Sequence, residues 1–184
     1  MSLQNKFDTC IFDLDGTLTD TLEDLKNSVN FAMRSMSFPE RTTDEVRGFL
    51  GNGVPMLIKR SAPENTSEEE LKRAYEFFKK HYAVHLNDNT APYEGINEML
   101  NALRQMNVKT AVVSNKDDDA VKNIVSGFFG DKILFAQGRK DGIPPKPSPE
   151  SVFEVMKKLD CEAERTIYVG DSDVDVETAH NAGL

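Results

Sequence analysis

The chain has 184 residues, of which 39% are hydrophobic, and it carries a formal net charge of −9 at pH 7. This length is sufficient for one domain, or for one domain with an insertion, and the ordinary apolar fraction argues against disorder. The negative charge argues against nucleic acid or an anionic membrane as the main partner, and no apolar run approaches the roughly 18 residues of a membrane span.

The cysteine content and the start of the chain indicate a reducing compartment. Cys10 and Cys161 do not make a disulfide framework, and no basic-then-apolar segment opens the sequence. Cys10 lies in an apolar run and is expected to pack in the core. We therefore expect a cytoplasmic protein, while the oligomeric state is left open.

The first predicted element is a short buried strand, Cys10-Ile11-Phe12, which runs directly into Asp13 and Asp15. The run favours β-structure, so the two acids are expected at its carboxyl end. In parallel sheets that end of a strand is where ligands bind. Two acids there can hold a divalent cation, and one of them can attack a phosphorus centre.

The next stretch, roughly residues 18–86, has helical patterns only and no good strand. Apolar residues at spacings of three and four predict its helices, and capping boxes that begin at Thr42 and Ser67 predict where two of them start. The predicted helices cover residues 20–36, 42–50, 54–60 and 67–85.

Strands and helices alternate after a turn-rich linker at residues 87–95. Ser148 is expected to cap one of these helices, with Pro149 at its first position. The predicted strands cover residues 109–115, 133–136 and 165–171, and the predicted helices cover residues 96–106, 118–128, 149–159 and a last segment that starts near residue 175.

This alternation predicts the α/β class, with a doubly wound parallel sheet and right-handed crossovers. The sheet domain would combine residues 1–17 with residues 90–184, and residues 18–89 would form an inserted helical domain with hinge linkers. The sequence stops where a helix would end and another strand could begin. We therefore expect the C-terminal part of the sheet domain to be missing from it.

Polar residues suited to phosphate chemistry follow three of the predicted strands. They are Asp13 and Asp15, then Ser114 and Asn115, then Asp171. Parallel strands bring these carboxyl ends to one edge of the sheet, and the loop that carries Lys146 can reach the same edge. The set contains a nucleophile, further acids, a hydroxyl and an ammonium, which suits phosphoryl transfer through an aspartyl-phosphate.

At these residues the sequence resembles the haloacid dehalogenase superfamily, and within it the phosphoglycolate phosphatase-like group. The family's four motifs are matched in order by residues 13–20, Ser114-Asn115-Lys116, Lys146 and residues 170–175. The resemblance implies a Rossmann-like core with an inserted helical cap. It also implies a Mg²⁺-dependent phosphatase that acts on small phosphorylated metabolites, and phosphoglycolate is the best single candidate.

The resemblance also implies roles for the matched acids. Asp13 would attack the phosphorus and become phosphorylated, and Asp15 would protonate the leaving oxygen and then take a proton from water. The Asp13 carboxylate, the Asp15 backbone carbonyl and Asp171 would hold Mg²⁺. An acid at position 15 also argues against dehalogenation, since the dehalogenases have none there.

The remaining matched residues would bind phosphate or support those that do. Ser114, Asn115 and Lys146 would contact the phosphoryl oxygens. Asp175 would orient Lys146 or metal-bound water, and Thr17 would support the first motif.

The helical insertion resembles the small cap that covers the site in this group, and a cap implies a small substrate. Gly51-Asn52-Gly53 is the sharpest candidate for a substrate-facing loop, although a helix break with a left-handed turn explains it equally well. Nearby cations are Arg47, Lys59 and Arg60, and any one of them could meet a second anionic group of the substrate.

Several alternatives stay open at this point. A phosphosugar mutase of the β-phosphoglucomutase type shares all four motifs but returns the phosphoryl group to a sugar. A signalling domain of the receiver type is phosphorylated on Asp without turnover, but its Asp would follow a later strand. A member that only binds is disfavoured by intact acids at 13, 15 and 171. Taken alone, Ser114 could be a helix cap and Lys146 a solvated loop residue.

Overall fold

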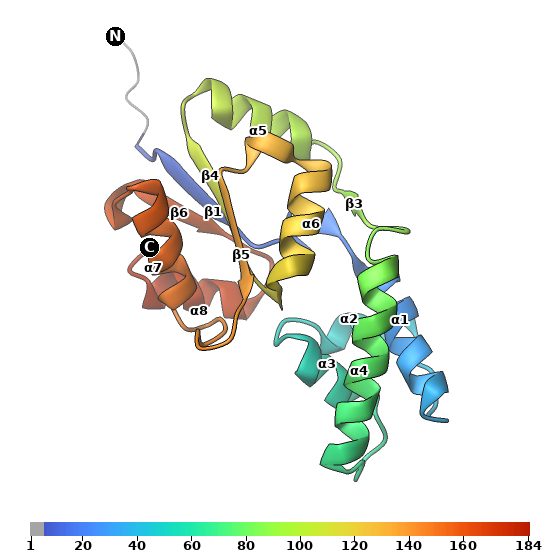
Figure 1. Cartoon of the computed structure of the whole chain (residues 1–184). Helices are drawn as coiled ribbons and strands as arrows, with labels where there is room; N and C mark the ends of the chain where they lie inside the picture. Colours follow the sequence, from blue (N-terminus) through green and yellow to red (C-terminus); the bar gives the residue numbers. More distant parts are fainter. Residues whose placement is uncertain (1–5) are drawn as a thin grey trace. The chain divides into compact units, whose positions relative to one another are not determined.

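The computed structural model describes residues 6–184 (Figure 1). The chain divides into two compact units. The first joins the N-terminal segment up to Thr19 with Pro92–Leu184, and the second is Asp20–Ala91. In the part of the chain that is described, no helix has the length and apolar character needed to cross a membrane.

The first unit is built on a four-stranded sheet with the strand order β5-β4-β1-β6. The strands are β1 (Thr9–Phe12), β4 (Lys109–Asp117), β5 (Phe135–Arg139) and β6 (Thr166–Val169). All of the neighbouring strands are parallel. The predicted α/β class with a parallel sheet is therefore confirmed.

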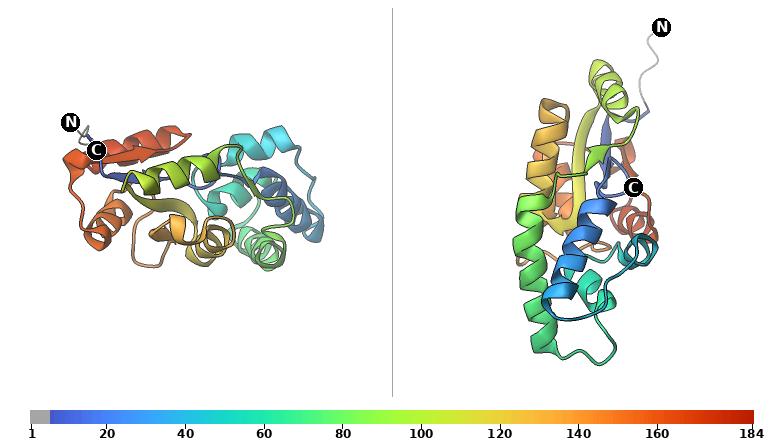
Figure 2. Two further views of the ribbon diagram at one scale, coloured as in Figure 1. Left: turned by 90° about the horizontal axis from the view of Figure 1, so that it is seen from above. Right: turned by 90° about the vertical axis from the view of Figure 1, so that its right-hand side faces the viewer.

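Helices flank this sheet, as the two views in Figure 2 show. Ile11 of β1 and Val113 of β4 pack in one buried cluster with Val152 and Val155. All four residues of β1 are buried, as expected for a central strand of a parallel sheet. The helices are α5 (Ile96–Gln105), α6 (Asp118–Phe128), α7 (Glu150–Leu159) and α8 (Asp173–Asn181), with short 3₁₀ turns at Gly130–Lys132 and Ala163–Arg165.

The strand order places the start of the chain at the middle of the sheet. From β1 the chain moves outward through β4 to β5, and it then returns to β6 on the other side of β1. Phe12, the last residue of β1, lies opposite Val112 on one side and Val169 on the other. The carboxyl end of β1 is thus a switch point of the topology, where open α/β sheets bind their ligands.

The second unit is mostly helical. Both predicted capping boxes are present, from Thr42 to Glu45 and from Ser67 to Glu70. Phe78 and Tyr82 are buried on the longest helix. The helices are α1 (Leu22–Ser35), α2 (Thr43–Phe49), α3 (Val54–Ser61) and α4 (Glu68–His85).

Two strand predictions need correction. The block predicted to contain only helices begins with a two-residue strand, β2 (Thr19–Asp20), which pairs with β3 (Ala91–Pro92) in a separate small sheet. The strand predicted at residues 133–136 is β5, which starts later and continues to Arg139. Pairing with β4 decides these bounds, and Gln137 and Gly138 have no apolar side chain that would mark them as strand residues.

The predicted start of α7 is also wrong. The helix begins at Glu150, and Pro149 occupies the cap position. The Ser148 hydroxyl is bonded to the Glu150 carboxylate instead of a backbone N–H group. Glu150 therefore competes with the backbone for the hydroxyl that we expected to cap the helix.

Candidate active site

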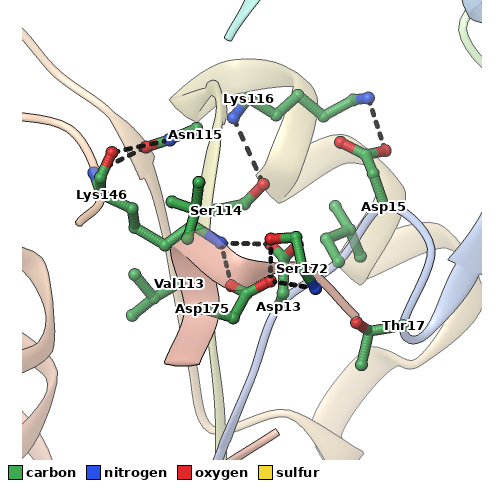
Figure 3. Close-up of polar contacts among 12 residues, drawn as sticks. Asp13, Asp15, Thr17, Val113, Ser114, Asn115, Lys116, Lys146, Ser172 and Asp175 are labelled. Carbon is green, nitrogen blue, oxygen red and sulfur yellow. Dashed lines mark hydrogen bonds and ion pairs between the residues drawn. The ribbon is translucent and has the colours of Figure 1, made fainter. Parts of the chain in front are cut away.

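Asp13 lies directly after β1, at the switch point. Its backbone N–H donates to the Val169 carbonyl at 2.9 Å, which extends the pairing with β6 by one residue. Its carboxylate is buried, and the Lys146 ammonium lies 2.9 Å from Asp13 Oδ1 (Figure 3). The predicted nucleophile is thus held beside a cation.

Lys146 reaches this position from the loop between β5 and α7. Its side chain is only 4% exposed and also contacts Asp175 Oδ1 at 2.7 Å, so the reading as a solvated loop lysine is wrong. Asn115 fixes the lysine's backbone from both sides. The Asn115 amide donates to the Lys146 carbonyl at 3.1 Å and accepts from the Lys146 N–H at 2.8 Å.

Asp175 uses both of its carboxylate oxygens. Oδ1 accepts from Lys146 and, at 3.3 Å, from the Tyr168 hydroxyl, whereas Oδ2 accepts from the Ser172 backbone and hydroxyl at 3.1 and 2.6 Å. The latter bonds form a capping box that starts α8. A Cβ atom on Gly170 would lie 2.3 Å from the Asp175 Cβ, so only glycine fits there.

Sequence reasoning missed Tyr168 and Ser172. The spacing from Ser172 to Asp175 is the capping-box pattern, and it could have identified Ser172. Tyr168 carries no such signal, because a tyrosine in a β-strand is ordinary.

Asp15 lies in the tight turn that follows Asp13. The Leu14 carbonyl accepts from the N–H groups of Leu18 and Thr19, both at 3.0 Å. The Asp15 carboxylate accepts a hydrogen bond from the Lys116 ammonium at 2.8 Å (Figure 3). Lys116 was matched only as a part of a motif, and its partner could not be read from the sequence.

Ser114 is buried near the end of β4. Its hydroxyl accepts from the Lys116 backbone N–H at 3.2 Å, two residues on. The helix that follows has Asp117 at its cap position, so the reading of Ser114 as a helix cap is wrong.

Asp171 follows β6, and its carboxylate is bonded to Thr17 of the first motif. The Thr17 hydroxyl donates to Asp171 Oδ1 at 3.2 Å. Oxygen atoms of Asp13, Asp171 and Asp175 all lie within 4.8 Å of one another. An all-oxygen set suits Mg²⁺, and since both oxygens of Asp175 already accept hydrogen bonds, Asp13 and Asp171 are the better candidates to hold such an ion.

Burial and neighbouring charges tune the site. Burial raises the pKa of Asp13 to about 6, and the nearby acids add to this effect while Lys146 opposes it. Burial lowers the pKa of Lys146, but the carboxylates of Asp13 and Asp175 outweigh burial and hold that pKa above its ordinary value. Lys146 therefore stays a cation at neutral pH, as an anion-binding group must.

The candidate specificity residues belong to the second unit. Gly51 and Gly53 have φ angles of +101° and +78°, as the left-handed break between α2 and α3 requires. Asn52 accepts a hydrogen bond from Arg60 at 2.9 Å, and the exposed Arg47 pairs with Asp44 at 2.7 Å. Contact of this loop or of Arg47 with substrate stays a prediction.

Comparison with known proteins was made on sequence and on structure. The haloacid dehalogenase-like hydrolase family matches residues 10–184. The phosphoglycolate phosphatase of Aquifex aeolicus is 34% identical over 178 residues, which cover 94% of this chain and 80% of that protein. The phosphoglycolate phosphatase of Pseudomonas syringae pv. tomato is 32% identical over 95% of this chain. The matched part is 66% of that protein's length.

A solved structure shares the whole fold. The predicted phosphoglycolate phosphatase from Haemophilus somnus has a TM-score of 0.90 and 30% identity, over 98% of this chain and 84% of that chain. The similarity therefore extends over both units and all four motifs.

Proposed function

We propose that this chain hydrolyses small phosphate monoesters through an aspartyl-phosphate. The chain belongs to the haloacid dehalogenase-like hydrolase family, and the similarity to its curated relatives identifies it as a phosphatase. The observation that carries the proposal is the buried Lys146 ammonium, 2.9 Å from the Asp13 carboxylate. A buried cation beside a nucleophile is suited to receive the phosphoryl group of an anionic substrate.

In the first step, the Asp13 carboxylate forms a bond to phosphorus while the bond from phosphorus to the leaving oxygen breaks. Asp15 gives that oxygen a proton. In the second step, water attacks the phosphorus of the aspartyl-phosphate, Asp15 takes a proton from the water, and phosphate leaves with Asp13 restored. Lys146 and the Ser114 hydroxyl bind phosphoryl oxygens throughout.

Asp13 and Asp171, together with the Asp15 backbone carbonyl, would hold Mg²⁺. When bound, this ion neutralises charge on the phosphoryl group. For Asn115 we propose a positioning role, because its amide is bonded to both backbone groups of Lys146. Phosphoglycolate is the proposed substrate because the curated relatives are named phosphoglycolate phosphatase. We also propose that the second unit acts as a cap that selects the substrate.

The test is a Mg²⁺-dependent screen of phosphate esters that includes phosphoglycolate, with the Asp13→Asn variant beside the wild type. We expect the variant to lose at least about 1000-fold in kcat, because an amide cannot form the acyl phosphate. Asp173→Asn is the matched control, since this exposed acid begins α8 outside the proposed machinery.

Undiminished hydrolysis by Asp13→Asn would refute the mechanism. Formation of an isomer from a sugar phosphate without release of phosphate would instead favour the mutase. A protein that is phosphorylated once and then stops would favour the signalling alternative.

A further inference from the structure

Lys116 is a buried cation that the proposed chemistry does not use. Its side chain is only 3% exposed, and its ammonium lies 2.8 Å from Asp15 Oδ1. An ammonium group is costly to bury without a carboxylate partner. The two residues are 101 positions apart, so the pairing is a product of the fold and not of local sequence.

The backbone on both sides of this ion pair is fixed. Lys116 is a residue of β4, and its N–H donates to the Ser114 hydroxyl. Asp15 lies in the turn that the Leu14 carbonyl closes, where it forms a bridge with Thr19. The turn places the Cα of Asp15, and a side-chain contact to the 22% exposed carboxylate helps to fix the direction of that group.

Lys116 supplies such a contact from β4, next to Asp117, whose pairing with Arg139 ties this end of the strand to β5. β4 pairs directly with β1, the strand that leads to Asp13. The direction of the Asp15 carboxylate is therefore set relative to the strand that leads to the nucleophile. Proton transfer depends on such alignment, and a misplacement of about 1 Å can cost on the order of 100-fold in rate.

We propose that Lys116 is a positioning residue for Asp15. Its ammonium holds the Asp15 carboxyl group in line with the leaving oxygen and, in the second step, with the attacking water. No new bond is made: the proton still passes from Asp15 to the leaving oxygen and later from water to Asp15. The inference rests on the proposed function, because it assigns Asp15 the proton transfers of that reaction.

The choice of ester separates the positioning of Asp15 from two other roles that Lys116 could have, which are binding of the phosphoryl group and stabilisation of the fold. An alkyl phosphate such as phosphoglycolate has a poor leaving group that needs a proton, whereas p-nitrophenyl phosphate has a good one that does not. A lysine that positions Asp15 matters mainly for the alkyl ester. A lysine that binds the phosphoryl group, or that only stabilises the fold, affects both esters equally.

The experiment measures kcat/KM for both esters, since this constant covers the step in which the leaving group departs. We expect Lys116→Met to lose about 10- to 100-fold with the alkyl ester and less than about 3-fold with the nitrophenyl ester. Asp15→Asn should show the same selectivity, and Lys116→Met should add little to it in the double variant. Lys122→Met, an exposed lysine on α6, should resemble the wild type.

Equal losses with the two esters, or losses that multiply in the double variant, would overturn the inference while leaving the proposed function intact. A wild-type protein that hydrolyses neither ester would refute the proposed function first. Thermal unfolding checks that each variant is folded. If Lys116→Met does not fold, Lys116→Arg retains the charge with altered geometry, and it should lose more with the alkyl ester than with the nitrophenyl ester.

Discussion

At the scale of single residues, the turn after Asp15 depends on a position where a side chain is excluded. Gly16 follows Asp15 with a φ angle of +86°. A Cβ atom there would lie 2.4 Å from Asp171 Oδ2 and 2.8 Å from its Cγ. The glycine thus lets the turn after β1 approach the acid that follows β6, and the same turn supplies the Thr17 hydroxyl to Asp171.

Gly16→Ala should therefore displace Asp171 and weaken metal binding. We expect the affinity for Mg²⁺ to fall by about 10-fold or more, and the free energy of unfolding to fall by about 1 kcal/mol or more from the strained φ angle. Titration calorimetry with Mg²⁺ measures the first effect. Gly48→Ala is the control, because nothing lies within 4 Å of its added Cβ. An unchanged affinity in Gly16→Ala would contradict the assignment of Asp171 as a ligand.

At the scale of elements, one acid joins both ends of the helical unit. Asp24 of α1 is 2% exposed. It accepts hydrogen bonds from the backbone and amide of Asn89 at 3.0 and 2.8 Å, and from the backbone and hydroxyl of Thr90, both at 2.8 Å. The segment that precedes β3 is thereby tied to the first helix. No short-range pattern indicates these hydrogen bonds, because Asn89 and Thr90 are 65 and 66 residues away from Asp24.

Asp24→Asn should destabilise the helical unit. The amide group brings N–H donors to a position where donors already converge, and a hydrogen bond to a charged group is worth about 1.5–3 kcal/mol. We expect a loss of about 2–3 kcal/mol in the free energy of unfolding at pH 7, measured by urea denaturation. Asp44→Asn is the matched control, since the carboxylate of Asp44 is 88% exposed and such pairs are worth little.

The contribution of Asp24 should also depend on pH. Burial raises its pKa, but the hydrogen bonds from Asn89 and Thr90 outweigh burial and lower that pKa below its ordinary value of 3.8. The stabilisation is therefore complete above the pKa of the unfolded chain and is lost as the pH falls through the folded one. The difference in unfolding free energy between wild type and Asp24→Asn should shrink below about pH 4. A difference that grew in acid would contradict this.

At the scale of the whole molecule, the site concentrates an excess of negative charge. The chain carries a net charge of −9, and three of its carboxylates lie within 4.8 Å of one another. Lys146 neutralises only part of this cluster. Mutual repulsion among these acids opposes folding, and a divalent cation that binds the folded state relieves it.

Mg²⁺ should therefore stabilise the protein beyond what ionic strength alone can do. At about 100 times its dissociation constant, a ligand of the folded state adds about 2.7 kcal/mol. We expect a rise in Tm with MgCl₂ that NaCl of matched ionic strength does not reproduce. Asp171→Asn should lose most of this Mg²⁺-dependent rise. An equal rise with both salts would show that the effect is general screening of the net charge.

The sequence by itself predicted the four strands of the main sheet and the helices in their order along the chain, the capping boxes of α2 and α4, and the acids and lysine of the four motifs, but not the short strands β2 and β3. These features are local, since a capping box spans four residues and a polar residue at a strand end is read within its own strand. What each side chain touches was decided only by the tertiary structure. Asn115 meets the Lys146 backbone across 31 residues, and Lys116 meets Asp15 across 101. Such contacts depend on sheet order, on register and on the direction of each side chain, and no short-range pattern encodes these.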